Sequence, residues 1–561
     1  MRAREYLLAF LGGLVVAVLV TWPLATDLTG QLPHDPRFAP FAGSDMNIWV
    51  WNFWWASEVV ENGSPAFYCD RIFPPGGHSL AFHTHTFLWS LASLPLQWAG
   101  GLFFAVNAML LLLFAAAATA AYALARELRL GPLAASLVAL AWAFSPYFLQ
   151  KGLVHLNLGA SPWLPLGLLF LLRWLNRPRT ESAWRPALGL GLVTGLCLLT
   201  GSLQTVYLAT ACVVLALVRP RLSDDHEPRR TALFGPVPLA VFFLGFFLTA
   251  QPFLGEWYSE SMASETYGAL PQDYHPRLVD FLTPSGQHPS FSGLGSAQPV
   301  PEAEFKGERS EHAALYLRFS LLALAVIGAA RYRLARPWMV GFGLLFLLAW
   351  DPGPDPEGWL SSLYRKQPPF DLLRVPARFL PAALLFLSLS AGFGLQWLLG
   401  VPRGRLVAGL LAAGLLFESW IGPYPVHPVT IPTAVERIAN GPSQGLVLTL
   451  PYYAGATESM LWQTQHGHDV PVSYVARTQP GQLELIRVTT PDLFALSLQL
   501  ALPTPSALAL DLRHAGIRHV LFRDTGLQDP TEFYAVLDGM DGWERSEDFG
   551  DGVEWWYRTA P

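Results

Sequence analysis

Charged residues are scarce in this chain of 561 residues. Asp, Glu, Lys and Arg make up 14% of it, and hydrophobic residues make up 52%. Soluble domains carry roughly 25% charged residues. Apolar runs recur along the chain at about the 20 residues that a membrane-spanning helix needs. These features exclude an ordinary soluble enzyme and predict a polytopic α-helical membrane protein.

Other features are missing as well. The three cysteines, Cys69, Cys197 and Cys212, show neither metal-binding spacing nor a disulfide framework. The net charge is −6, and no basic tract is long enough to predict a nucleic-acid partner. The PPGG run at 74–77 lacks the strand–loop–helix setting of a phosphate-binding loop. No internal repeat is visible, which argues against transporters built from repeated halves.

Arginine is concentrated in short connections between the apolar runs, and these connections predict the topology. Positive charge stays on the cytoplasmic side of membrane proteins. Placing all of these connections there requires about 11 spans, with the N-terminus inside and the chain after residue 422 outside. The approximate spans are 5–24, 102–125, 132–150, 160–175, 186–200, 203–218, 232–252, 313–330, 337–350, 379–400 and 405–421. Residues 87–100 are expected to form an interfacial or re-entrant helix, because a full span there would reverse the arginine pattern.

The long polar segments fall outside the membrane on this topology. A multi-span domain, residues 1–421, would carry three large outer loops, at 25–86, 253–312 and 351–378. The cytoplasmic connections are short by comparison. We therefore expect chemistry or binding on the outer face of the cell membrane.

The character of the chain changes after residue 422. A proline-rich linker is followed by short apolar runs typical of strands, with a helix and a glycine before the second of them. The runs lie at 445–451, 519–524 and 552–560. Residues 422–561 are therefore predicted to form an extracytoplasmic α/β domain.

The most informative stretch is GSDMNIWVWNFWW, residues 43–55. It joins one carboxylate to several tryptophans, and tryptophan favours the membrane–water interface. If the stretch is helical, Asp45, Trp49 and Asn52 share one face, and an apolar stripe lies beside them. The stripe consists of Ile48, Trp51, Trp55 and Val59. We predict a helix at the membrane surface that presents Asp45.

Three roles are open for Asp45. A carboxylate at the lipid–water boundary can act as a general base towards a hydroxyl acceptor. It can also help to hold a divalent cation. The third role is structural, that of a solvated aspartate at the start of a helix, which it caps.

Two arginines, Arg374 and Arg378, enter the tenth predicted span from outside in the run LLRVPARFLPAALLF. They fall on one face of a helix, and guanidinium groups recognise phosphate in a planar, bidentate way. We predict that they bind the phosphate of a lipid-linked substrate, with Arg365 and Lys366 adding positive charge. The alternative is that both anchor the helix end to lipid headgroups.

Three histidines, His78, His83 and His85, lie in the run FPPGGHSLAFHTHTF. The His-x-His spacing places two rings on one side of a strand. The run predicts either histidines that line a substrate site or, with a further ligand such as Asp45, a metal site. Whether a divalent cation binds stays open at this point.

Isolated polar residues gather at the outer ends of the predicted spans. Lys151, His155, Gln204 and Glu256 are among them. Ionisable groups at membrane depth are costly and tend to line cavities. His155 and Glu256, together with Asn52, are our further candidates for lining a substrate.

With these residues placed, the chain resembles bacterial membrane glycosyltransferases of the GT-C superfamily. The similarity rests on Asp45 in the first outer loop, on the Pro-Gly-His run that follows it, and on AYALAREL at the end of the next span. FSPYFLQKGLVHLNLGASPWLPL, LLRVPARF and LLFESWIGPYP resemble recurring pieces of the less characterised members, over roughly residues 1–421. One departure is that many members carry a paired acidic motif in the first loop, whereas Met46 and Asn47 follow Asp45 here.

The resemblance implies transfer of a sugar from a polyprenyl-phosphate-linked donor to a glycan, lipid or protein acceptor on the outer face. It also implies that Asp45 takes the proton of the acceptor hydroxyl, that Arg374 and Arg378 bind the departing lipid phosphate, and that the anomeric centre is inverted. Because mid-span charges are almost absent, an enzyme is favoured over a transporter or lipid flippase. A catalytically inactive GT-C-like envelope scaffold is the remaining alternative.

Overall fold

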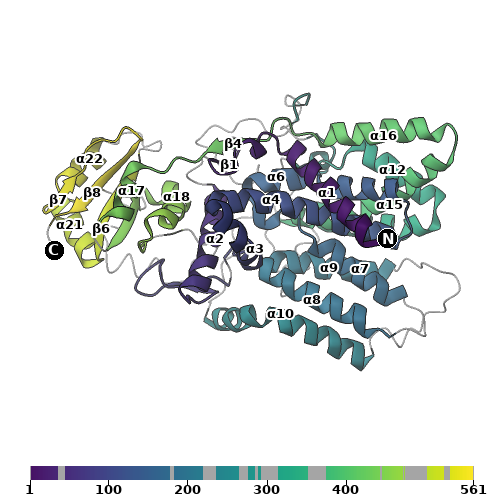
Figure 1. The fold of residues 1–561 in the computed structure, drawn as a ribbon, viewed down its shortest axis with the longest axis horizontal. Coiled ribbons are helices and arrows are strands. Elements are labelled where there is room, and N and C mark those ends of the chain that lie inside the picture. Colours follow the sequence, from purple (N-terminus) through teal and green to yellow (C-terminus); the bar gives the residue numbers. More distant parts are fainter. Residues whose placement is uncertain are drawn as a thin grey trace. The chain divides into compact units, whose positions relative to one another are not determined.

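The computed structural model describes most of the chain, and the helical part predominates (Figure 1). The described residues are 2–35, 44–81, 83–176, 182–218, 235–263, 276–284, 288–291, 314–351, 375–442, 445–471, 473, 502–523 and 531–559. They cluster into two compact units. The first unit is Met1–Leu28, Asn107–Gln251 and Gly268–Val426, and the second is Thr29–Val106, Pro252–Tyr267 and His427–Pro561.

The first unit is built from apolar helices. Its helices are α1 (Arg2–Val20), most of α4 (Leu94–Glu127), α5 (Pro132–Ala143), α6 (Pro146–Val154), α7 (Trp163–Asn176), α8 (Trp184–Thr200), α9 (Ser202–Val218), the first part of α10 (Pro236–Ala263), α12 (Phe319–Arg331), α13 (Arg336–Trp350), α15 (Leu380–Gly400) and α16 (Gly404–Ser419). Helices α7, α8 and α9 pack side by side (Figure 1). Helix α15 is buried along most of its length and contacts α5, α12, α13 and α16.

Helices α12 and α15 approach each other closely because glycines face each other. A Cβ atom on Gly394 would lie 1.9 Å from the carbonyl oxygen of Leu324, and one on Gly328 would lie 2.1 Å from that of Ser390. Small residues allow membrane helices to pack backbone against backbone. The glycines therefore hold α15 in the centre of this group of helices.

The outer faces of several helices expose large apolar side chains. Leu19 of α1, Leu248 of α10 and Leu406 of α16 are each about two-thirds exposed or more. Exposed apolar surface of this extent indicates contact with a membrane. Of the described helices, five are long and apolar enough to cross one, and the pair α5–α6, bent by 41°, makes a sixth. The helices suit a multi-pass membrane protein, while the count of about 11 spans and the topology stay predictions.

Residues 87–100 form short helical pieces. Helix α3 covers Phe87–Ala92, and α4 begins at Leu94. Gly101 interrupts α4 with a φ of 83° and a ψ of 178°, which glycine adopts without steric cost. The break coincides with the predicted start of a span at residue 102. Whether the pieces before it lie at the membrane interface stays a prediction.

The second unit contains a four-stranded sheet in the order β5-β6-β8-β7. Its elements after His427 are α17 (Thr433–Asn440), β5 (Leu446–Leu450), α18 (Tyr452–His466), α21 (Pro505–His514), β6 (Ile517–Arg523), α22 (Thr531–Asp538), β7 (Trp543–Arg545) and β8 (Val553–Arg558). Strands β5 and β6 are parallel, and β8 is antiparallel to both β6 and β7. The three runs predicted as strands correspond to β5, β6 and β8.

A core of apolar side chains joins this sheet to its helices. The helix predicted before the second strand is α21, and Gly516, with a φ of 74°, makes the turn into β6. Val520 and Phe522 of β6 pack with Leu508 of α21 and Trp556 of β8. The second unit also includes Thr29–Val106, so a separate C-terminal domain that begins near residue 422 stays a proposal.

The remaining described elements are short, except for helix α2. They are η1 (Leu24–Thr26), β1 (Gln31–Pro33), α2 (Asp45–Glu61), β2 (Tyr68–Cys69), β3 (His78–Ser79), η3 (Leu156–Leu158), η4 (Leu278–Phe281), η6 (Arg333–Ala335), η8 (Pro376–Phe379) and β4 (Val426–Pro428). Strands β2 and β3 form an antiparallel pair in the loop that follows α2.

Helix α2 confirms the predicted helix, and its apolar stripe is covered by other parts of the chain. Ile48, Trp51 and Trp55 do form one apolar stripe, and all three are fully buried. The stripe packs against protein, including Met460 of α18 and Val470. An apolar stripe is stabilised equally by lipid or by a protein core, so periodicity alone could not distinguish the two.

Candidate functional site

Asp45 is the first residue of α2. Ser44 is the residue that caps the helix, since its Oγ accepts a hydrogen bond from the backbone N–H of Met46 at 3.2 Å. Asp45 therefore lies in the first turn, where the helix dipole stabilises a negative charge. Its side chain is partly exposed, whereas the eight residues after it are buried. The structure thus presents Asp45 at the accessible end of a buried helix.

Asn52 lies two turns further along the predicted Asp45 face and is fully buried. Its Nδ2 donates a hydrogen bond to the carbonyl oxygen of Thr84 at 2.9 Å. This bond connects α2 to the segment that carries His83 and His85. Asn52 Oδ1 has no hydrogen-bond partner among the described residues, so it is available to a substrate hydroxyl or a water molecule.

The histidines are buried beside aromatic rings. The ring of His83 lies edge-on to Trp51 with the centroids 6.0 Å apart, and His85 Nε2 lies 3.0 Å from the carbonyl oxygen of Ala66. Burial lowers the pKa of His85 to about 4. Burial, with His85 and His78 nearby, holds the pKa of His83 well below its usual range. His83 and His85 are therefore uncharged at neutral pH.

A metal site of the expected kind is incomplete in the described part of the chain. Among the described residues, no three or more His, Cys, Asp or Glu side chains lie together in an arrangement that could hold a metal ion. Whether the histidines line a substrate site or take part in a metal site therefore stays a prediction.

Glu256, at the C-terminal part of α10, belongs to the same unit as α2. Burial and the nearby carboxylate of Glu256 raise the pKa of Tyr68 in the loop after α2. Phe253, one turn earlier on α10, packs edge-on against Phe67 with the ring centroids 5.5 Å apart, and Phe67 in turn contacts the ring of His85. The structure thus brings Glu256 and His85, predicted separately, to the same part of the molecule.

Arg378 lies in η8, just before α15, and lines a pocket of the first unit. Among the described residues that line it, Arg378 is the one that carries a charge. The aromatic lining residues are Trp142, Tyr147, Phe148, Trp163 and Tyr207, and Ser161 and Gln204 add polar groups.

Hydrogen bonds fix the walls of the pocket. Trp142 Nε1 donates to the carbonyl oxygen of Pro381 at 2.8 Å, and Trp163 Nε1 donates to Oγ1 of Thr200 at 2.8 Å. The aromatic residues of this pocket were not predicted from the sequence, because they come from several separate helices. The break between α5 and α6 at Ser145-Pro146 was the available signal.

Lys151 and His155 lie close to this pocket in the chain but do not line it. Lys151 is fully buried, with its Nζ 5.6 Å from the ring centroid of the lining residue Tyr147. His155 ends α6, and its backbone N–H donates to the carbonyl oxygen of Lys151 at 2.9 Å.

The remaining predicted cations cannot be placed. Arg374, Arg365 and Lys366 lie outside the described residues. Arg378 belongs to the first unit and Asp45 to the second.

Comparison with solved structures shows what this arrangement of helices resembles. The chain is similar to the arabinofuranosyltransferase AftD from Mycobacteria, with a TM-score of 0.59 and 16% sequence identity, over 100% of this chain and 40% of that one. It is also similar to the apo form of the oligosaccharyltransferase from Archaeoglobus fulgidus, with a TM-score of 0.51 and 13% identity, over 92% of this chain and 69% of that one. The fold is that of the GT-C glycosyltransferases.

The chain spans about 40% of the length of AftD, and identities of this size establish the fold and not the reaction. No protein-family model and no curated protein matches the sequence. The fold predicted from the sequence resemblance is confirmed, and the activity is inferred below.

Proposed function

We propose that the chain is an integral membrane glycosyltransferase of the cell envelope. It transfers a sugar from a polyprenyl-phosphate-linked donor to a glycan, lipid or protein acceptor on the outer face of the cell membrane, with inversion. The observation that carries this proposal is Arg378 on an aromatic-lined pocket of a chain with the GT-C fold. Aromatic faces suit sugar rings and prenyl chains, and the arginine suits a phosphate.

Arg378 binds the donor phosphate in this proposal. The bond from the anomeric carbon to the phosphate oxygen breaks during transfer, so negative charge grows on the departing lipid phosphate. A guanidinium group aimed at that charge stabilises the transition state. Arg374 lies one helical turn earlier in the sequence, and Arg365 and Lys366 add positive charge in the same segment.

Asp45 is the general base. It removes the proton from the acceptor hydroxyl while that oxygen bonds to the anomeric carbon, and a single displacement inverts this centre. Asn52, His83 and His85 are uncharged and hydrogen-bond to substrate hydroxyls, and Glu256 and His155 are further lining residues. Adding a chelator to the transfer assay determines whether a divalent cation assists.

The test of the base measures transfer of radiolabelled sugar in membranes that contain the full chain, with a panel of hexosyl and pentosyl polyprenyl phosphates. Asp45→Asn should lower transfer at least 100-fold, since general bases contribute roughly 10²- to 10⁴-fold. Asp70→Asn is the matched control, because Asp70 is an exposed aspartate of the same loop. Full activity of Asp45→Asn would remove Asp45 from the mechanism.

The test of the phosphate site compares donor and acceptor kinetics. Arg378→Ala should raise the KM for the donor about 10-fold or more and leave the KM for the acceptor unchanged, because only the donor carries the phosphate. Losing one charged hydrogen bond costs roughly 1.5–3 kcal/mol. Arg403→Ala, at an exposed arginine just before α16, is the control. Equal changes in both KM values would indicate that Arg378 has only a structural role.

A further inference from the structure

Helix α2 shares one hydrophobic core with a segment about 400 residues later in the sequence. Trp51 and Trp55 stack with their ring centroids 5.7 Å apart. Around them lie Cys69 from the loop after α2, together with Met460 and Val470. Cys69 is fully buried there as a free thiol. The first outer loop and residues 445–470 therefore fold together.

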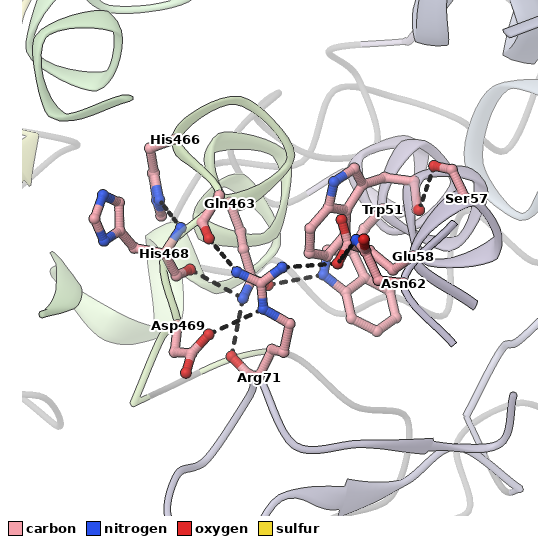
Figure 2. A network of polar contacts seen from close by, with 11 residues as sticks. Trp51, Ser57, Glu58, Asn62, Arg71, Gln463, His466, His468 and Asp469 are labelled. Carbon is pink, nitrogen blue, oxygen red and sulfur yellow. Dashed lines mark hydrogen bonds and ion pairs between the residues drawn. The ribbon is translucent and has the colours of Figure 1, made fainter. Parts of the chain in front are cut away.

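One glutamine forms hydrogen bonds to α2, to the loop after α2 and to the residues that follow α18 (Figure 2). Gln463 of α18 is fully buried, and its Oε1 accepts a hydrogen bond from Trp51 Nε1 at 2.8 Å. Its Nε2 donates to the carbonyl oxygen of Arg71 at 2.9 Å and to that of His468 at 3.2 Å. Removing this amide would leave a buried N–H of Trp51 and two carbonyl groups without these partners, and such groups are costly.

Arg71 makes a second set of contacts at the same place (Figure 2). Its Nη1 lies 3.0 Å from Glu58 Oε2 on α2, and its Nε lies 3.0 Å from Asp469 Oδ1. Its Nη2 donates to the carbonyl oxygen of Gly467. A planar guanidinium group can satisfy all three acceptors at once, which an ammonium group does with poorer geometry.

These contacts lie on the helix that begins with Asp45. Trp51 is six residues after Asp45, which corresponds to about 9 Å along a helix axis. Rotation or displacement of α2 at Trp51 would therefore move Asp45 as well. Small displacements of a catalytic group lower the reaction rate strongly.

We propose that Gln463 and Arg71 are positioning residues, which hold α2 against residues 445–470 in the orientation in which Asp45 acts. The C-terminal part of the chain is then a required component of the catalytic unit and not an accessory. This inference rests on the proposed role of Asp45 as the base.

The first measurement follows the core directly. Cys69 is labelled with a maleimide in the full chain, in a background in which Cys197 and Cys212 are replaced by serine. In Gln463→Leu, labelling of Cys69 should accelerate about tenfold or more, the factor that corresponds to 1.4 kcal/mol in the equilibrium for opening. Gln465→Leu is the control, because Gln465 lies on the same helix and contacts its neighbour Thr464.

The second measurement separates positioning from folding. Gln463→Glu keeps an oxygen acceptor for Trp51 and loses the two donated bonds. Arg71→Lys keeps the charge and loses the planar group. Both milder variants should fold, and both should lower kcat about tenfold while the KM for the donor stays unchanged. Asp45→Asn should abolish transfer, while the maleimide labels Cys69 as slowly as it does in the wild type.

The outcomes distinguish the two proposals. If the Gln463 and Arg71 variants leave kcat and Cys69 protection unchanged while Asp45→Asn is inactive, the positioning inference is overturned and the base assignment stands. If they expose Cys69 and leave kcat unchanged, the contacts are structural only, and the inference is also overturned. If Asp45→Asn is fully active, the base assignment fails, and with it the positioning role.

Discussion

The pH dependence of stability gives a sharp test of the C-terminal part, through Glu458 of α18. The side chain of Glu458 is 4% exposed, and its Oε1 lies 3.1 Å from Nη1 of Arg523 at the end of β6. Arg523 in turn lies over the ring of Trp462, 5.4 Å from its centroid. Burial raises the pKa of Glu458 from 4.5 to about 7, although Arg523 lowers it.

The direction in which pH changes the stability follows from the protonation of Glu458 in the folded and in the unfolded chain. Below pH 4.5 Glu458 is protonated in both the folded and the unfolded chain. Between pH 4.5 and about 7 the folded state still holds the proton and the unfolded state has lost it, so stability falls as the pH rises. At 1.36 kcal/mol per pKa unit, the loss that is complete by pH 8 is about 3 kcal/mol.

Glu458→Gln removes the titration and keeps an oxygen that can accept a hydrogen bond from Arg523. The melting temperature of the purified full chain in detergent is followed by tryptophan fluorescence at pH 4.5 and at pH 8. Relative to the wild type, the melting temperature of the variant should gain about 3 °C between the two pH values. Glu436→Gln, at an exposed carboxylate of α17, should follow the wild type at both.

The wild-type profile contains opposing contributions, so the difference between the variant and the wild type is the informative quantity. Burial lowers the pKa of His466, also on α18, to about 3, and this group adds stability as the pH rises from about 3 to 6.5. His466 is present in both proteins and cancels in the difference. If the melting temperatures of the wild type and of Glu458→Gln change with pH in parallel, Glu458 is not a buried carboxyl group with a raised pKa, and the reasoning is refuted.

Two further predictions concern α2 and the packing of α15. Ser44→Ala removes the cap of α2, which costs about 1 kcal/mol, and should accelerate maleimide labelling of Cys69 about fivefold; an unchanged rate would show that α2 is held without its cap. Gly394→Ala places a methyl group 1.9 Å from a carbonyl oxygen of α12 and should lower the melting temperature of the full chain. Gly409→Ala, where a Cβ meets no atom within 4 Å, should leave it unchanged or raise it, and equal effects of the two would contradict the close approach of α12 and α15.

Local patterns were sufficient to predict many of the elements. The start of α2, its apolar stripe through Ile48, Trp51 and Trp55, and the strands β5, β6 and β8 follow from hydrophobic periodicity and capping, which depend on neighbours in the sequence. The low charge and the long apolar runs likewise indicated a helical membrane protein. The GT-C fold was predicted from short motifs and is confirmed by the solved structures.

The surroundings of those elements were decided only by the tertiary structure. The stripe of α2 is covered by Met460 and Val470, and the pocket around Arg378 takes its walls from separate helices, because both depend on contacts between residues far apart in the sequence. His83 and His85 are uncharged because they are buried, and burial is a property of the folded chain. The sequence by itself determined that Asp45 begins a helix. The tertiary structure decided that Gln463 and Arg71 contact this helix and that its apolar stripe faces a protein core, since an apolar face has no preference of its own between protein and lipid.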